Sequence, residues 1–358
     1  MTPILVRATP STTVPVAIRA LLLLLALVGI VALPWWLGPA RLGAAVEIAY
    51  MLALAVLWNL LAGYAGIVSI GQQAFVGLGG YALFALIVLA GVPPLAALPL
   101  AGIAAALAAL PVASLLFRLR GPHFAIGSWV VAEVFRLLFA QVTALGGGSG
   151  QSLPVAAVRS IAPDRAGRQL ILYGVAVLVA AGAALLAWGV LRSRQGLGLT
   201  AVRDSEMAAA SLGVDVGRLK LAVYVAVAGV TGIVGALIFL QNLRISPDAA
   251  FSVADWTANV VFITVIGGIG TLEGPFVGAL VFFLFRYSFA EFGTWYMISL
   301  GVLAAFVMLA APGGICGALA RYGVVLFPTE RRLGVRTMAG SRTVLNQADR
   351  PPGCSGAQ

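Results

Sequence analysis

Long apolar runs recur along this 358-residue chain and limit the folds that it can adopt. A helix that crosses the hydrocarbon core of a bilayer needs roughly 20 apolar residues, and several runs approach that length. Hydrophobic residues make up 61% of the sequence and charged residues 9%, which is more apolar surface than a soluble core could bury. The runs are continuous, whereas a membrane β-barrel needs short segments of alternating polarity. We therefore predict an all-α polytopic membrane protein with about ten transmembrane or broken helices.

Apolar windows place the predicted spans at residues 20–37, 44–62, 67–90, 95–117, 124–143, 170–191, 221–240, a Gly-broken pair at 256–266 and 276–289, and 294–311. The first is expected to be a retained span rather than a cleaved signal peptide, because many further spans follow it. Most Lys and Arg residues fall in loops that this count places inside, so both termini are predicted to be cytoplasmic. The predicted organisation is a cytoplasmic segment 1–19, a transmembrane domain 20–311 and a cytoplasmic, largely disordered tail 312–358.

Charge and reactive side chains give no sign of catalysis. The formal net charge of +10 follows from cytoplasmic Lys and Arg, so it does not indicate nucleic-acid binding. His123 is the single histidine, and Cys316 and Cys354 have no metal-ligand spacing. The sequence contains no Ser-His-Asp set and no phosphate-binding loop with a Lys after it. We predict no catalytic residue, no metal site and no cofactor.

A charged island at residues 192–220 separates two predicted spans. A segment so rich in charge is either solvated or docked against another protein. Asp204 is positioned to cap a short Ala-rich helix, with Glu206 in its first turn, where the helix dipole favours an anion. Gly213 is expected to end this helix in the left-handed conformation.

The charged side chains inside predicted spans include Glu133, Arg136 and Arg286. Glu133 and Arg136 are three residues apart on one helix, so they are predicted to form an intramembrane ion pair. A gate or a contact with a partner subunit is the alternative for this pair. Arg286 has no evident helical partner, and we expect it to snorkel toward the headgroups.

Nine short blocks occur in an order that resembles the permease subunits of ATP-binding-cassette importers of the branched-chain amino-acid type, a family that also includes urea and amide permeases. The blocks are 63–66 (GYAG), 69–75 (SIGQQAF), 77–81 (GLGGY), 119–126 (LRGPHFAI), 147–150 (GGSG), 201–206 (AVRDSE), 245–248 (ISPD), 267–275 (GGIGTLEGP) and 312–315 (PGGI). Each block alone is weak evidence, and the ordered set is strong.

The resemblance implies a non-catalytic, multi-pass subunit of a bacterial-type inner membrane. It also implies a second permease subunit, cytoplasmic ATPase subunits that supply energy, and an extracytoplasmic solute-binding protein. The island would then hold the cytoplasmic coupling helix that fits a groove on the ATPase. The residues implied in coupling are Arg203, Asp204, Glu206, Ala208, Ala209 and Gly213. The wider pattern has a Glu where Met207 stands here, and Glu206 comes one residue earlier.

Two glycine-rich breaks are candidates for the wall of the translocation path. Irregular backbone at membrane depth survives only where protein covers it or where it lines a water-filled cavity. Gln72 and Gln73 need partners, which neighbouring helices or the cavity would supply. The alternative for any single glycine is close helix packing, as expected for Gly229, Gly232 and Gly235. The candidate path residues are Ser69, Gln72, Gln73, Gly77, Gly267, Gly268 and Gly270.

Other function classes fit the sequence less well. An ion-coupled secondary transporter also uses broken helices near the midplane, but it gives no reason for the charged island. An integral-membrane enzyme would need a catalytic constellation, which the sequence lacks. A permease for urea or short amides is not distinguished from one for branched-chain amino acids by any residue pattern.

Overall fold

The computed structural model describes residues 38–289, 294–311 and 313–321, together with the isolated positions 29, 32–34 and 36. The predicted segment 1–19, nearly all of the predicted span 20–37 and most of the predicted tail 312–358 lie outside these residues. In the described part helices dominate, and the one sheet has two strands of two residues each. The predicted all-α class is therefore confirmed.

The first half of the described chain contains four apolar helices and a cluster of short elements. They are α2 (Pro39–Asn59), η1 (Leu60–Tyr64), α3 (Gln72–Val88), α4 (Pro94–Leu116), α5 (Pro122–Ala140), η2 (Thr143–Leu145), η3 (Gly147–Ser149), β1 (Gln151–Ser152) and α6 (Val155–Arg159). Here η1 is a π-helical turn that continues α2, and η2 and η3 are 3₁₀ turns.

The second half begins with the longest helix and ends with a series of shorter ones. Its elements are α7 (Arg165–Arg192), α8 (Arg194–Asp204), α9 (Glu206–Ser211), α10 (Val216–Asn242), β2 (Arg244–Ile245), α11 (Pro247–Ala250), the π-helical η4 (Val253–Ala258), α12 (Asn259–Gly267), α13 (Gly274–Phe289), α14 (Thr294–Ala310) and α15 (Gly314–Arg321). Residues 314–321, which the sequence analysis assigned to the tail, are thus helical.

Seven helical segments of the described residues are long and apolar enough to cross a membrane, and α3 and α13 are shorter apolar helices. The chain is therefore a multi-pass membrane protein. One predicted boundary is wrong, because the span expected at 67–90 is helical only from Gln72. Gly66 has a left-handed φ of +69°, and the backbone from there to Gly71 runs outside any helix.

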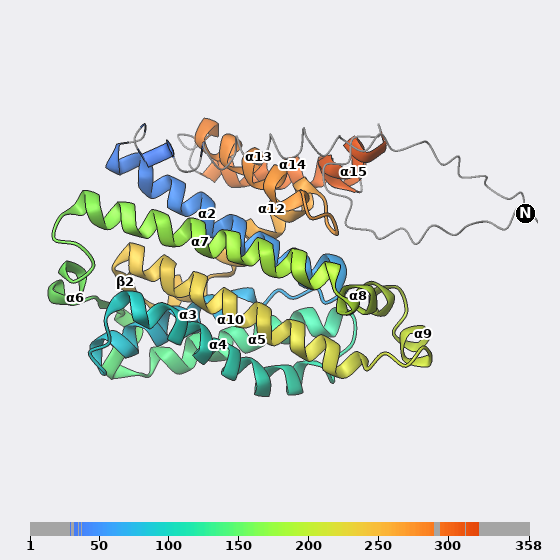
Figure 1. The fold of residues 1–358 in the computed structure, drawn as a ribbon, viewed down its shortest axis with the longest axis horizontal. Helices are drawn as coiled ribbons and strands as arrows, with labels where there is room; N and C mark the ends of the chain where they lie inside the picture. The colour runs from blue at the N-terminus through green and yellow to red at the C-terminus, as the bar shows by residue number, and fades with distance from the viewer. Residues whose placement is uncertain are drawn as a thin grey trace, which may run out of the picture.

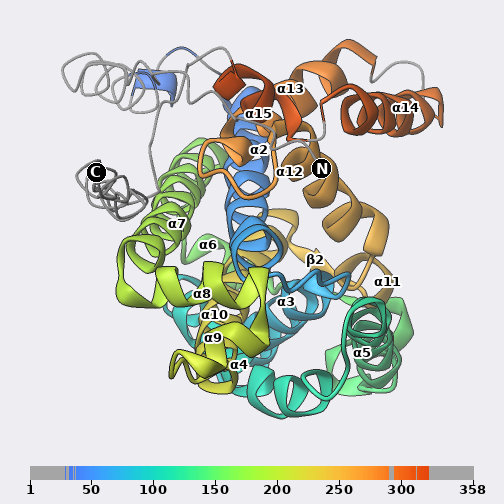
Figure 2. The same ribbon diagram turned by 90° about the vertical axis from the view of Figure 1, so that its right-hand side faces the viewer.

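The helices form a bundle in which α10 and α2 occupy the centre. α10 packs against α4 and α3, and α2 packs against α7 and α12. Figure 1 shows the long helices side by side, with α8 and α9 at one end and α6 and β2 at the other. Figure 2, which looks onto the α8 and α9 end, shows α5 beside α3 and α11 at the edge of the bundle.

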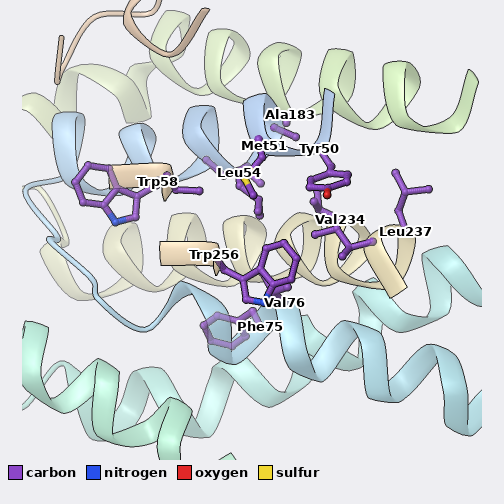
Figure 3. Packing of buried hydrophobic residues seen from close by; sticks show 14 of the residues in the cluster. Tyr50, Met51, Leu54, Trp58, Phe75, Val76, Ala183, Val234, Leu237 and Trp256 are labelled. Atoms are coloured by element: carbon purple, nitrogen blue, oxygen red, sulfur yellow. The ribbon is translucent and has the colours of Figure 1, made fainter. Parts of the chain in front are cut away.

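Aromatic and aliphatic side chains from several helices fill the centre. Figure 3 shows Tyr50, Leu54 and Trp58 of α2 facing Val234 of α10 and Trp256 of η4. The rings of Tyr50 and Trp256 meet edge to face with centroids 6.4 Å apart. Such pairs favour one packing arrangement over others, so they fix how η4 lies against α2.

Small residues let α10 approach its neighbours closely, as predicted for Gly229, Gly232 and Gly235. A Cβ added to Gly232 would overlap Ala105 of α4, and one added to Gly235 would overlap the backbone of Val76 in α3. Lipid tails are as apolar as leucine, so close van der Waals contact is a main source of attraction between these helices.

Gly235→Ala should therefore destabilise the bundle. An added methyl group in a fully packed contact costs about 1–3 kcal/mol, because a backbone neighbour must move. We expect a lower apparent Tm for the purified protein in detergent. Gly182→Ala is the matched control, since a Cβ at Gly182 of α7 meets nothing within 4 Å. Equal Tm values for the two variants would contradict the packing argument.

Candidate functional site

The charged island folds into α8 and α9 at one end of the bundle (Figure 1). The predicted helix with Glu206 in its first turn is present, and Gly213 follows it with a φ of +84°, as predicted. The predicted cap is wrong. Ser205 has extended backbone and its Oγ accepts a hydrogen bond from the Ala208 amide at 3.3 Å, whereas Asp204 is still part of α8.

The outer surface of the island combines ion pairs with exposed apolar side chains. Lys220 at the start of α10 pairs with Glu206 of α9, which ties the short helix to a long one. Met207 is 84% exposed and Leu212 is 82% exposed, although both lie in a solvated, charged segment. Ala209 points the other way and is buried.

Ser205→Ala should loosen α9 selectively. Loss of a side-chain cap costs about 1 kcal/mol, which corresponds to roughly fivefold faster amide exchange in a helix this short. Hydrogen–deuterium exchange of a peptide covering residues 206–211 measures this change. In Asp204→Ala the same peptide should exchange at the wild-type rate, because Asp204 bonds Arg203 rather than the amides of α9. Faster exchange in Asp204→Ala alone would show that the cap is misassigned.

On its inner side the island reaches into the bundle through Arg203. Arg203 Nη1 donates to the carbonyl oxygen of Gly63 in η1 at 2.9 Å, and Nε bonds Asp204 Oδ1 at 3.1 Å. A Cβ on Gly66 would lie 3.3 Å from Arg203 Cγ, so the turn after η1 packs directly on this side chain. The arginine implied in coupling therefore faces the membrane domain with part of its guanidinium.

The predicted break in the helix before residue 276 is present. α12 ends at Gly267 and α13 begins at Gly274, with no helix between them. Thr271 holds this turn, because its Oγ1 donates to the Gly268 carbonyl at 2.9 Å and accepts from the Gly274 amide at 3.0 Å. Gly267 lies in close contact with Gly274, and Gly268 lies against Gly314 of α15.

Asn59 connects this break to α2. Its Nδ2 donates to the Thr271 carbonyl at 2.7 Å, and its Oδ1 accepts from the Gly270 amide at 2.8 Å. The side chain is almost fully buried. Sequence analysis missed this residue because one Asn at the end of an apolar run has no local partner. The sequence did contain one indication: the predicted break before residue 276 has backbone groups that need hydrogen-bond partners at membrane depth.

The first break, residues 65–71, is held in a similar way. The Trp58 indole N–H donates to the Ser69 carbonyl at 2.8 Å, and the Ile70 amide donates to Ser128 Oγ of α5 at 3.0 Å. The Ser69 hydroxyl accepts from the Gly71 amide at 3.1 Å. Residues 65–71 lead into α3. The first residue of α3, Gln72, donates a hydrogen bond from Nε2 to the Leu54 carbonyl of α2.

The two glutamines at the start of α3 are buried, and each uses only part of its amide. Gln72 Nε2 donates to the Leu54 carbonyl at 3.0 Å, and Gln73 Oε1 accepts from the Thr257 hydroxyl of η4. Gln72 Oε1 and Gln73 Nε2 have no hydrogen-bond partner among the described residues. One turn further along α3, Gly77 is in close contact with the ring of Phe251.

Two groups of charged side chains within the apolar helices form ion pairs. Glu133 and Arg136 form the predicted ion pair at 2.6 Å, and Arg136 also bonds Asp248 of α11 at 2.7 Å. Arg286, for which we expect snorkelling toward the headgroups, has a partner on another helix, because its Nη1 bonds Glu47 Oε1 of α2 at 2.6 Å. This contact joins residues more than 200 positions apart, so helical spacing could not indicate it.

Two of the sequence blocks meet at the opposite end of the bundle. β1 and β2 pair antiparallel with Gln151 opposite Ile245, and the Leu153 amide donates to the Leu243 carbonyl at 2.9 Å. A Cβ on Gly150 would overlap the Ile245 carbonyl, which requires glycine there. The blocks at 147–150 and 245–248 therefore form one clasp between α5 and α10.

The amino-acid sequence matches the model of a known transport family. The family described as "Branched-chain amino acid transport system / permease component" matches residues 40–312. The chain belongs to this permease family. The matched region includes η1, both breaks, the island and the clasp.

Two curated relatives of the permease are the high-affinity branched-chain amino acid transport system permease proteins LivM of Escherichia coli and Salmonella typhimurium. The first is 26% identical over 279 residues, which is 72% of this chain and 65% of that protein. The second is 26% identical over 319 residues, which is 83% of this chain and 75% of that protein. This chain thus spans slightly less than two thirds of the Escherichia coli relative. No solved structure matches the permease.

The described part of the permease offers hydrogen bonds rather than metal chemistry at its buried polar sites. Its described residues contain no group of three or more His, Cys, Asp or Glu side chains that could hold a metal ion. The polar groups within the bundle are amides, hydroxyls and backbone carbonyls, apart from the ion pairs.

Proposed function

We propose that the permease is the translocation subunit of an ATP-binding-cassette importer that moves branched-chain amino acids or similar small solutes into the cytoplasm. A partner ATPase supplies the energy. The observation that carries this proposal is the island, within a chain of this permease family. It presents Met207 and Leu212 to the outside, and Arg203 bonds the bundle on the inside.

In this proposal the island is the cytoplasmic coupling helix of the transporter. α9 fits a groove on the ATPase, where Met207 supplies apolar contact area and Glu206 supplies charge. The ion pair between Glu206 and Lys220 links α9 to α10, a central helix of the bundle, so a displacement of α9 is transmitted to α10. The proposed coupling residues remain Arg203, Asp204, Glu206, Ala208, Ala209 and Gly213. Ala209 and Gly213 act through the fold of α9 rather than through contact.

The proposed path for solute passes the two breaks. At the first break, the start of α3 presents a helix N-terminus, which favours an anionic group such as the carboxylate of an amino acid. The unpaired Gln72 Oε1 and Gln73 Nε2 would supply further hydrogen bonds. Ser69, Gly77, Gly267, Gly268 and Gly270 complete the proposed set. The last three belong to the second break, and Gly77 sets the packing of α3 against Phe251.

The proposed assembly has four kinds of component. A second permease subunit completes the path, two ATPase subunits engage the island, and an extracytoplasmic binding protein delivers solute to the clasp end. This orientation places both termini in the cytoplasm, as the distribution of Lys and Arg predicts. The membrane is the inner membrane of a bacterial-type cell.

Uptake of a labelled amino-acid panel tests the substrate. Cells that lack the gene should lose most of their saturable uptake of one or more branched-chain amino acids, and a plasmid copy should restore it. Cells complemented with the empty plasmid are the control. Loss of urea or short-amide uptake with branched-chain amino acid uptake intact would refute the proposed substrate and favour the amide branch of the family.

Met207→Asp tests the docking of the island. A carboxylate at an apolar contact costs roughly 2 kcal/mol or more, so we expect at least a tenfold weaker association with the ATPase, and uptake should fall with it. Met207→Leu keeps the apolar surface and should behave like the wild-type protein. Co-purification of the ATPase and uptake are the two measurements. Unchanged co-purification of Met207→Asp would mean that this face does not bind the ATPase.

A further inference from the structure

We propose that Asn59 and Arg203 are positioning residues of a single joint, in which the island holds both breaks of the membrane domain together. The joint consists of Asn59, Gly63, Arg203, Gly270 and Thr271. This inference rests on the proposed function, because it assigns a role in coupling. Neither Asn59 nor the link between the two breaks follows from membership of the family.

The first part of the joint is the grip of Asn59 on the second break. Both polar atoms of the Asn59 amide bond the backbone of the break. Oδ1 accepts from the Gly270 N–H at 2.8 Å, and Nδ2 donates to the Thr271 carbonyl at 2.7 Å. A carboxylate could satisfy only the first of these bonds, and an aliphatic side chain neither. Asn59 is almost fully buried and its two partners are half-buried, so loss of the side chain leaves backbone groups that are only partly accessible to water.

The second part is the backbone contact between η1 and the second break. A Cβ on Gly63 would overlap the backbone of Gly270 and Oδ1 of Asn59, so η1 lies directly against the second break with the bonded Asn59 amide beside the contact. Gly270 has a φ of +78°, which places its amide toward Asn59 and suits glycine. Movement of η1 should therefore displace the break, because the contact is between backbone groups and an amide that is hydrogen-bonded to the break.

The third part is the hold of the island on η1. Arg203 Nη1 donates to the Gly63 carbonyl, the group that touches Gly270. The same side chain packs on Gly66, where the first break begins. Arg203 thus packs on the start of one break. It reaches the other break through Gly63 and also lies beside it, because a Cβ on Gly270 would be 3.7 Å from Arg203 Nη1. A hydrogen bond from a charged donor to a carbonyl is stronger than one from a neutral donor, so this contact can persist when the island is displaced.

The two breaks are suited to move because most of their backbone amides make no helical hydrogen bond, those of Ala65 and Gly268 excepted. Residues 65–71 and 268–273 are held by the side chains of Trp58, Asn59, Ser128 and Thr271 instead. A change in such bonds reorients a break without unwinding a long helix. When the ATPase displaces the island, the joint makes both breaks respond together, and each contributes residues to the proposed path.

Hydrogen–deuterium exchange of the purified permease tests the joint without any substrate. Arg203→Ala should speed exchange at least fivefold in the peptide that covers 268–273, a segment to which Arg203 makes no hydrogen bond. Arg203→Lys should return the rate toward that of the wild type, because Lys keeps one donor for the Gly63 carbonyl. Arg218→Ala is the control, since Arg218 pairs with Asp215 on the same island and is 90% exposed. Unchanged exchange at 268–273 in Arg203→Ala would overturn the proposal.

Transport by the complete transporter in proteoliposomes tests its consequence. Asn59→Asp keeps the size of the side chain and loses the donor to Thr271, so the solute taken up per ATP hydrolysed should fall at least tenfold. Asn59→Ala is the second variant, should the buried carboxylate prevent folding. A wild-type ratio in Asn59→Ala or Arg203→Ala would refute the joint. Failure of the wild-type transporter to import any amino acid refutes the proposed substrate instead, and the exchange experiment then decides about the joint.

Discussion

The need to satisfy backbone hydrogen-bonding groups at membrane depth governs this structure. A helix satisfies its own groups, but residues 65–71 and 268–273 leave the helical path and need partners from elsewhere. Five side chains supply many of them: the Trp58 indole, the Asn59 amide, and the hydroxyls of Ser69, Ser128 and Thr271. Each bond joins segments that are far apart in the chain or closes a turn within a break. The irregular backbone and the polar side chains that bond it therefore depend on each other.

The same constraint applies to charge. Arg286 of α13 neutralises Glu47 of α2, and Arg136 of α5 pairs with Glu133 of the same helix and with Asp248 of α11. An unpaired charge at the bilayer centre costs about 2.5–3.5 kcal/mol on insertion scales, so the two pairs between helices, Glu47–Arg286 and Arg136–Asp248, limit how far those helices can separate. The island differs because its ion pairs lie in solvated segments, where they contribute about 0–1 kcal/mol each. In the proposed function, the outer surface of the island binds the ATPase, and Arg203 attaches the island to the bundle.

Sequence reasoning succeeded where the signal was local or ordered along the chain. The Glu133–Arg136 pair follows from helical spacing, and the left-handed Gly213 follows from the end of an Ala-rich helix. It failed where two adjacent residues competed for one role, as with Ser205 and Asp204, since both types cap helices well. Glu47 and Asn59 lie beyond any local rule, because their partners are more than 200 residues away. Neighbouring helices in this bundle are often distant in sequence, as with α2 and α12.

The class of the protein, the approximate spans, the position of the island and the glycine-rich breaks all follow from the amino-acid sequence. These are properties of single segments, and hydropathy, charge and helix-ending residues decide them one segment at a time. Which polar group meets which backbone group depends on how the helices pack: Asn59 bonds Gly270 and Thr271, and Arg203 bonds Gly63. A buried hydrogen-bonding group in a membrane must find a partner, but the chemistry of the group does not say where that partner lies. Geometry between helices makes that choice, and here it brings the island and both breaks to one place.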